Sequence, residues 1–129
     1  MPDTPPDGFT PFDAGDYFDL IGPVYERDGV LGIRIEDRHR NSGGNAHGGF
    51  LATLCDTALG RAIHAEADEA AVTVSLTTDY LKGVEPGQWV EAHTEVEKLG
   101  GSLAFADCSL HADGTEVVRA RAVFAVLGG

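Results

Sequence analysis

Positive charge and cysteine are both scarce in this sequence, and each shortage excludes a class of protein. Nine Lys and Arg residues stand against 21 Asp and Glu residues, giving a formal net charge of −12. Nucleic-acid binding and attraction to anionic membranes both need a basic surface, so neither is expected. The two cysteines, Cys55 and Cys108, form no CxxC pair and lie in apolar stretches. They indicate buried free thiols and a reducing, cytoplasmic setting rather than a disulfide framework.

Long apolar runs are missing as well. No segment approaches the roughly 20 apolar residues that cross a bilayer, so no membrane-spanning segment is predicted. The first eight residues are acidic and rich in proline, without the basic and apolar regions of a secretory signal. We expect residues 1–8 to form a flexible arm and residues 9–129 to form a single domain.

One segment has the periodicity of a long apolar helix. From Gly48 to about Ala67, apolar residues recur at steps of three and four, which is the repeat of a helix face. Gly60 lies inside this segment, where it lowers helix stability by about 1 kcal/mol relative to Ala, and we interpret it as a sign of close packing. Because the helix is apolar on several sides, the rest of the chain must cover most of its surface.

Strands are predicted on both sides of this helix by the alternation of apolar and polar residues. One strand precedes the helix and four follow it, separated by turn signals at Pro86-Gly87, Gly100-Gly101 and Asp113-Gly114. Short turns between consecutive strands predict antiparallel pairing of sequence neighbours. The expected strands cover residues 30–36, 72–80, 90–96, 103–110 and 118–126.

Residues 9–29 give a weaker signal. We expect a short helix capped by Thr10, with Pro11 at its first position and the Gly22-Pro23 pair ending it. Together the elements predict an α+β fold in which one long central helix is wrapped by a curved antiparallel β-sheet. A free edge strand of such a sheet is prone to association, and a dimer that continues the sheet would cover it.

The stretch Asn41–Gly49 is the leading candidate for a catalytic site. This loop is rich in Gly and Asn and runs directly into the predicted helix. The first turn of a helix has backbone N–H groups without intrahelical partners, and the helix dipole favours negative charge beside them. One carboxylate, Asp56, lies in the apolar segment that follows.

The spacing of Gly48 and Asp56 restricts how they act together. Eight residues of helix separate them by about 12 Å along the axis and by about 80° around it. One substrate carbonyl therefore cannot meet the Gly48 N–H and the Asp56 carboxylate of the same helix. If both act on one substrate, they come from two subunits with antiparallel helices, and the site requires a dimer.

Residue types alone leave several roles open. Asp56 is either a solvated residue of a helix face or a partly buried nucleophile or general base. His47 fits a base, a metal ligand or a brace for the loop, and Asn41 fits either an orienting amide or an ordinary Asx-turn. The five histidines show no metal-binding spacing, and both the dinucleotide fingerprint and the P-loop are missing, so no metal or cofactor is expected.

The motif Asn41-x-x-Gly44-x-x-His47-Gly48-Gly49, with Asp56 seven residues further on, resembles the hotdog-fold acyl-CoA thioesterases. The resemblance is to the branch that holds the phenylacetic-acid-degradation (PaaI) thioesterase and thioesterase superfamily member 2. It covers roughly residues 18–127, and it is clearest outside the loop at residues 22–25, 72–81 and 98–105.

This resemblance implies hydrolysis of acyl-CoA thioesters to free acid and CoA. It implies that Gly48 polarises the thioester carbonyl through its backbone N–H and that Asp56 of the neighbouring subunit acts as general base or nucleophile. Thr73 falls where the branch often carries a serine near the attacking water. The remaining implied site residues, which would position the thioester and the loop or contact substrate, are Asn41, His47 and Gly49. The family builds its site at a dimer interface and often forms dimers of dimers, so a homodimer and a homotetramer are expected.

An acyl-CoA substrate carries phosphates, so the acidic chain has to supply basic side chains locally. Each basic candidate has an alternative as ordinary solvated charge, and the sequence does not choose among them. They are Arg38, Arg40, Lys82, Lys98, Arg119 and Arg121. The alternative function is a non-catalytic acyl-thioester-binding or structural dimer of the same fold, which would have no need of a carboxylate at position 56.

Overall fold

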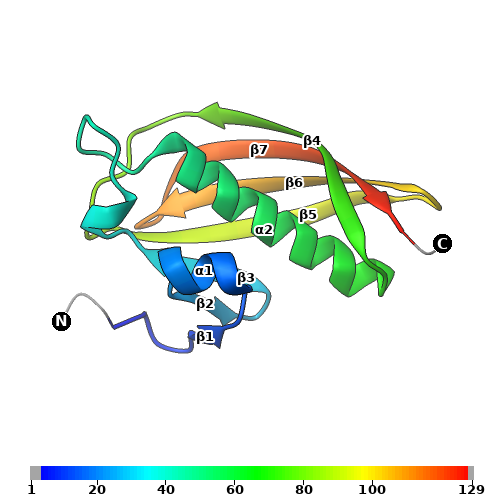
Figure 1. Cartoon of the computed structure of the whole chain (residues 1–129), viewed down its shortest axis with the longest axis horizontal. Helices are drawn as coiled ribbons and strands as arrows, with labels where there is room; N and C mark the ends of the chain where they lie inside the picture. Colours follow the sequence, from blue (N-terminus) through cyan, green and yellow to red (C-terminus); the bar gives the residue numbers. More distant parts are fainter. Residues whose placement is uncertain (1–3, 128–129) are drawn as a thin grey trace.

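A seven-stranded antiparallel sheet curves around one long helix, α2 (Gly48–Ala67), in the computed structural model, which describes residues 4–127 (Figure 1). The predicted α+β architecture is confirmed, and α2 has the predicted bounds. The other elements are β1 (Thr10–Phe12), α1 (Asp16–Ile21), β2 (Val24–Arg27), β3 (Val30–Arg34), the 3-10 turn η1 (Asp37–His39), β4 (Ala71–Tyr80), β5 (Trp89–Leu99), β6 (Leu103–Ala112) and β7 (Thr115–Val126).

Small side chains on the sheet allow α2 to lie close to it. The helix contributes large buried residues, among them Leu54, Leu59 and Ile63. The strands that it packs against contribute many alanines to the same core, and these short side chains let the two layers approach closely. The small buried residues of β5, β6 and β7 are Ala92, Ala104, Ala106, Cys108, Ala112, Ala120 and Ala122.

Gly60 is not required by packing within the chain. A Cβ atom at this position would lie 3.5 Å from the ring of Phe124, which is an ordinary van der Waals distance. Among the described residues of one chain, no contact is close enough to require glycine at this position, and close packing here stays a prediction. Its open side faces a groove described below with the candidate site.

The strand that follows α2 takes an unexpected place in the sheet. β4 pairs with β7, so the strand order is β1-β2-β3-β5-β6-β7-β4 and the expected pairing of β4 with β5 is wrong. The turn at Pro86-Gly87 belongs to a connection that passes the N-terminal end of α2, where Val84 O accepts a hydrogen bond from the Ala46 N–H (2.7 Å). This detour lets β4 and β5 enclose the helix from two sides. The hairpins β5–β6 and β6–β7 form as predicted.

The N-terminal region corrects a second prediction. Residues 10–12 form strand β1, which pairs with β2, rather than the first turn of a helix. Pro11 is tolerated there because an edge strand leaves one row of N–H groups without sheet partners. The helix α1 begins only at Asp16, after Gly15 with its positive φ of 94°, and it ends at Ile21, directly before the Gly22-Pro23 pair that was predicted to end it.

Part of the predicted N-terminal arm contacts the sheet. The Arg34 guanidinium donates to Thr4 O and that of Arg27 donates to Asp7 O, each at 2.9 Å. Residues 1–3 lie outside the described residues. The flexibility of the arm stays a prediction.

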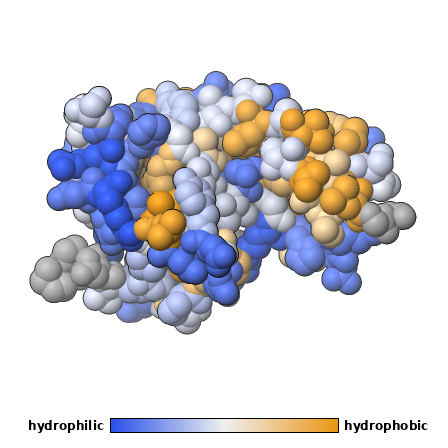
Figure 2. Space-filling view, viewed as in Figure 1, coloured by the Kyte–Doolittle hydropathy of each residue, from blue (hydrophilic) through white to orange (hydrophobic). Residues whose placement is uncertain are grey.

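β4 forms one edge of the sheet and carries exposed apolar side chains. Val72 and Val74 are 49% and 61% exposed. Figure 2 shows apolar surface gathered toward the end where β4 begins and β7 ends. The dimer that would cover this edge stays a prediction. Among residues 4–127, no helix is long and apolar enough to cross a membrane.

Candidate active site

The loop before α2 is folded around the side chain of Asn41. Its Oδ1 accepts hydrogen bonds from the backbone N–H groups of Gly43 (2.8 Å) and Asn45 (3.3 Å). The Asn41 N–H in turn donates to Asn45 O (2.7 Å). Of the two roles left open for Asn41, this geometry is that of an Asx-turn. It closes the loop tightly and brings His47 to the start of the helix.

His47 caps the first turn of α2. Its Nδ1 accepts a hydrogen bond from the Gly49 N–H (2.9 Å), so this nitrogen is unprotonated and Nε2 can carry a proton. Within the described part of the chain the Gly48 N–H has no hydrogen-bond partner. This N–H lies at the positive end of a 20-residue helix, where negative charge is favoured. The turn can therefore stabilise an oxyanion.

Tyr80, at the end of β4, closes the other side of this turn. Its hydroxyl donates to the carbonyl oxygen of Gly48 (2.7 Å), and its ring lies 3.2 Å from where a Cβ atom at position 48 would be. The side chain remains 52% exposed. Sequence patterns did not indicate Tyr80 as part of the site, because nothing in one sequence links positions 32 residues apart on a strand and a helix.

His39 fastens the loop to the core. Its buried ring stacks on Phe50 of α2, with ring centroids 4.2 Å apart, and its carbonyl accepts the His47 N–H (2.7 Å). Nδ1 accepts from the Glu36 N–H (2.9 Å), whereas Nε2 donates to Ile21 O (2.6 Å), so the ring is neutral. Burial lowers the pKa of His39. No motif in the sequence points to this role for His39.

Asp56 lies on the same helix as Gly48 but pairs with a different residue of β4. The Thr73 hydroxyl donates to Asp56 Oδ1 at 2.6 Å, and the Asp56 side chain is half-buried. The two residues line an open groove of 540 Å³ between α2 and the start of β4, with Gly60, Arg61 and Phe124 along it. The carboxylate is therefore both accessible and oriented by a hydroxyl donor.

Three of the six basic candidates lie beside the loop. Arg38 and Arg40 immediately precede it, and the backbone of Arg40 forms an isolated antiparallel β-bridge with Ala46. Lys82 precedes Gly83, where an added Cβ atom would lie 2.8 Å from the Asn45 side chain across the loop. Arg38 is already paired with Glu36 at 2.8 Å, and Arg40 lies 3.9 Å from Asp37.

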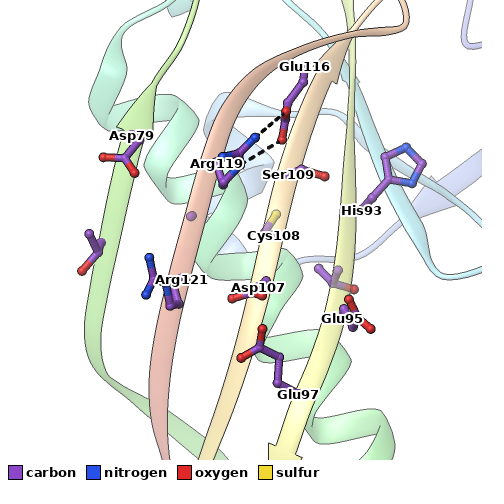
Figure 3. A pocket seen from close by; sticks show the side chains of 13 residues that line it. Asp79, His93, Glu95, Glu97, Asp107, Cys108, Ser109, Glu116, Arg119 and Arg121 are labelled. Carbon is purple, nitrogen blue, oxygen red and sulfur yellow. Dashed lines mark hydrogen bonds and ion pairs between the residues drawn. The ribbon is translucent and has the colours of Figure 1, made fainter.

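The other three basic candidates lie elsewhere. Lys98 is near the end of β5, at the opposite end of the long strands from the loop (Figure 1). Arg119 and Arg121 alternate with buried residues of β7, so they project from the outer face of the sheet, away from α2 (Figure 3). Within one chain the structure does not bring these three residues to Gly48 or Asp56.

The outer face carries a groove of 510 Å³ with charges of both signs (Figure 3). Arg119 pairs with Glu116 at 2.9 Å, and this hydrogen bond lowers the pKa of Glu116. A hydrogen bond between Glu97 and Asp107 raises the pKa of Glu97. The groove is separated from Asp56 by the sheet, so it forms no part of the candidate site in one chain.

In the part of the chain that the structure describes, neither a metal-binding cluster nor an accessible thiol lies near the site. Among residues 4–127, no cluster of three or more His, Cys, Asp or Glu side chains has metal-binding geometry. Cys55 and Cys108 are free and buried, as predicted. Their mutual hydrogen bond and burial raise the pKa of Cys108, which disfavours the reactive thiolate.

Known proteins are similar to this chain in sequence. The thioesterase superfamily model matches residues 43–119, which run from within the loop through α2 and the strands β4, β5 and β6 into β7. A Pseudomonas aeruginosa protein provisionally named an esterase is 41% identical over 127 residues, covering 92% of this chain and 95% of that protein.

Solved structures agree with the sequence matches. Zebrafish thioesterase superfamily member 2 superposes with a TM-score of 0.71 and 31% identity, covering 77% of this chain and 73% of that chain. A Streptococcus pneumoniae thioesterase protein solved with coenzyme A has a TM-score of 0.73 and 27% identity, covering 77% of each chain. The chain therefore belongs to the thioesterase superfamily, and it is a thioester hydrolase of the hotdog fold.

Proposed function

We propose that the protein hydrolyses acyl-CoA thioesters, converting RCO–SCoA and water to RCOOH and CoA–SH. The observation that carries this proposal is the pair of groups on α2. The Gly48 N–H at the helix N-terminus has no hydrogen-bond partner in residues 4–127, and the half-buried Asp56 is bonded to Thr73. The coenzyme A bound by the Streptococcus relative supports CoA as the thiol portion of the substrate.

Gly48 is the electrophilic half of the proposed site. Its N–H donates to the thioester oxygen, which gains negative charge as the tetrahedral intermediate forms, and the helix dipole adds to the stabilisation. Asn41 and His47 hold the turn in place through the bonds described above. Gly49 contacts the substrate beside Gly48.

Asp56 is the second half of the proposed site. As a general base it takes a proton from water that attacks the carbonyl, and as a nucleophile it forms an acyl anhydride that water then hydrolyses. Both routes expel the CoA thiolate, which leaves as the thiol after protonation. The Thr73 hydroxyl holds the carboxylate by its bond to Oδ1, which leaves the other oxygen free for the reaction.

The two halves serve one substrate only in a homodimer. α2 runs without interruption through Gly48 and Asp56, so these two residues of one chain lie about 12 Å apart along the helix axis. We place the partner across the free edge of β4, where Val72 and Val74 are exposed, with the two α2 helices antiparallel. The homotetramer is also a proposal, for which the outer face of the sheet, with exposed Leu103 and Phe105, offers a surface.

Arg38, Arg40 and Lys82 are the proposed partners of the CoA phosphates, because they lie at the loop. Any contribution from Lys98, Arg119 or Arg121 would have to come from a neighbouring subunit. The two free thiols favour the cytoplasm as the site of action.

Hydrolysis is tested by following thiol release from acetyl-, medium-chain, benzoyl- and phenylacetyl-CoA. We expect Asp56→Asn to lower kcat/KM by about 10²–10⁴-fold, the usual contribution of a positioned acid–base group. Glu66→Gln, an exposed carboxylate on the same helix, is the matched control and should keep the wild-type rate. Failure of the wild-type protein to cleave any of these thioesters, or full activity of Asp56→Asn, would contradict the proposal.

A further inference from the structure

Strand β4 contacts both halves of the candidate site, through two side chains that point toward α2. Near its start Thr73 bonds to Asp56, and at its end Tyr80 bonds to Gly48. Thr73 matched a family position, whereas Tyr80 is assigned no role by the resemblance or by the proposed mechanism. This exposed tyrosine lies directly beside the Gly48 N–H, the proposed oxyanion donor.

The contact between Tyr80 and Gly48 restrains the peptide geometry of the turn. The hydroxyl donates to Gly48 O at 2.7 Å, while the ring packs against the Cα side of the same glycine. The carbonyl and the N–H of Gly48 are joined through one Cα, so fixing the carbonyl restricts the direction of the N–H. Burial of the phenol and the nearby Cys55 raise the pKa of Tyr80, so the hydroxyl keeps its proton at neutral pH.

We propose that Tyr80 is a positioning residue for the reaction, which aims the Gly48 N–H at the thioester oxygen. This inference rests on the proposed function. It differs from a purely structural role because the phenol is half exposed and lies outside the buried core. Loss of its hydroxyl should therefore affect the transition state more than the folded state or the binding of the ground state.

The conservative variant Tyr80→Phe tests the hydroxyl alone. We expect kcat to fall about five- to twentyfold while KM stays within about twofold, because the misaimed donor acts on the developing oxyanion. The thermal midpoint should change little. Tyr25→Phe, which removes a hydroxyl from a partly buried tyrosine of β2, is the control and should keep the wild-type kcat.

A double-mutant cycle tests the ring. In Gly48→Ala the new Cβ atom meets the Tyr80 ring at 3.2 Å and pushes the turn aside. Combining it with Tyr80→Ser removes the ring, so Gly48→Ala should lower kcat by a smaller factor in that background than in the wild type. If Tyr80→Ser does not fold, the cycle is run with Tyr80→Leu, which lacks the aromatic ring.

The outcomes separate this inference from the proposed function. If the wild-type protein cleaves acyl-CoA but Tyr80→Phe keeps the wild-type kcat, or changes only KM, the positioning role is overturned and the hydrolase proposal stands. If Gly48→Ala and the Tyr80 variant lower kcat independently of each other, the positioning role is overturned as well. If the wild-type protein cleaves no thioester, both proposals fail together.

Discussion

At the residue scale, the orientation of Asp56 depends on one hydroxyl. Thr73 supplies the 2.6 Å hydrogen bond, and its extra methyl group relative to serine has no part in it. We predict that Thr73→Ser keeps kcat within about threefold of wild type, whereas Thr73→Val, of the same shape without the hydroxyl, lowers kcat about tenfold, as expected for a lost bond to a charged group. Steady-state thioester hydrolysis measures both. Equal rates for the two variants would show that the hydroxyl is dispensable.

A second prediction at this scale concerns His39 and the dependence of folding stability on pH. Burial lowers its pKa in the folded protein below the ordinary value of about 6.5. As pH falls below about 6.5, the unfolded chain therefore takes up a proton at His39 before the folded protein does. Folding stability should decrease from pH 6.5 down to the lowered pKa of the folded state. Above pH 6.5 this histidine contributes no pH dependence.

Thermal midpoints at pH 7.5 and pH 5.5 measure this effect. We expect His39→Gln to be less stable than wild type at pH 7.5, because it loses the stacking on Phe50, but to lose less stability on acidification. The exposed His64 provides the control, since His64→Gln should keep the wild-type dependence on pH. A wild-type pH dependence in His39→Gln would show that other groups are responsible.

At the element scale, Gly60 lowers the stability of α2 without being required by the packing of one chain. The Cβ atom of an alanine would contact Phe124 at 3.5 Å without a clash. We predict that Gly60→Ala stabilises the protein by roughly 0.5–1 kcal/mol, because glycine is a poor residue inside a helix. Chemical denaturation measures this change in the free energy of unfolding. Destabilisation would mean that the open side of Gly60 is in contact with another subunit.

The elements themselves differ in how well they could be predicted. α2 and the strands β5, β6 and β7 follow strong periodic patterns and clear turn signals, so their existence was predictable, and so were the bounds of α2. The three strands extend two to four residues beyond their predicted ranges, because their ends lie outside the clear alternation. β1 and β2 are short strands of three and four residues, too brief for a pattern to emerge. The pairing of β4 with β7 was not predictable from local turns, because it is imposed by the need to enclose α2.

The residues of the candidate site also divide into those that local sequence predicts and those that it does not. The loop Asn41–Gly49 and Asp56 form a nearly continuous motif, and Thr73 was found through the family resemblance. Tyr80 reaches Gly48 only because β4 crosses back along α2, which is a property of the fold. Residues that act through tertiary contacts of this kind carry no local signal.

At the scale of the whole molecule, the exposed edge of β4 predicts assembly through Val74. This side chain is 61% exposed at an irregularity in the strand. We predict that Val74→Asp shifts the protein from dimer to monomer and lowers kcat at least tenfold, because the proposed site needs two subunits. Light scattering coupled to size-exclusion chromatography measures the mass.

The control for this change is Leu20→Asp. Leu20 is 71% exposed on α1, away from the β4 edge of the sheet, so its substitution should leave mass and activity unchanged. A monomeric Val74→Asp protein with full activity would contradict the shared site. An unchanged mass would place the interface elsewhere.

Because one uninterrupted helix carries both Gly48 and Asp56, a dimer assembled as proposed would allow complementation between inactive alleles. Gly48→Pro removes the N–H at the first helical position, where the backbone accepts proline, and its Cβ atom also meets the Tyr80 ring; Asp56→Asn removes the carboxylate. In a mixed dimer of these two chains, one site collects both defects and the other has none. Random assembly from equal amounts should therefore restore about a quarter of the wild-type sites. Two genes that encode inactive proteins would then together support activity in one cell.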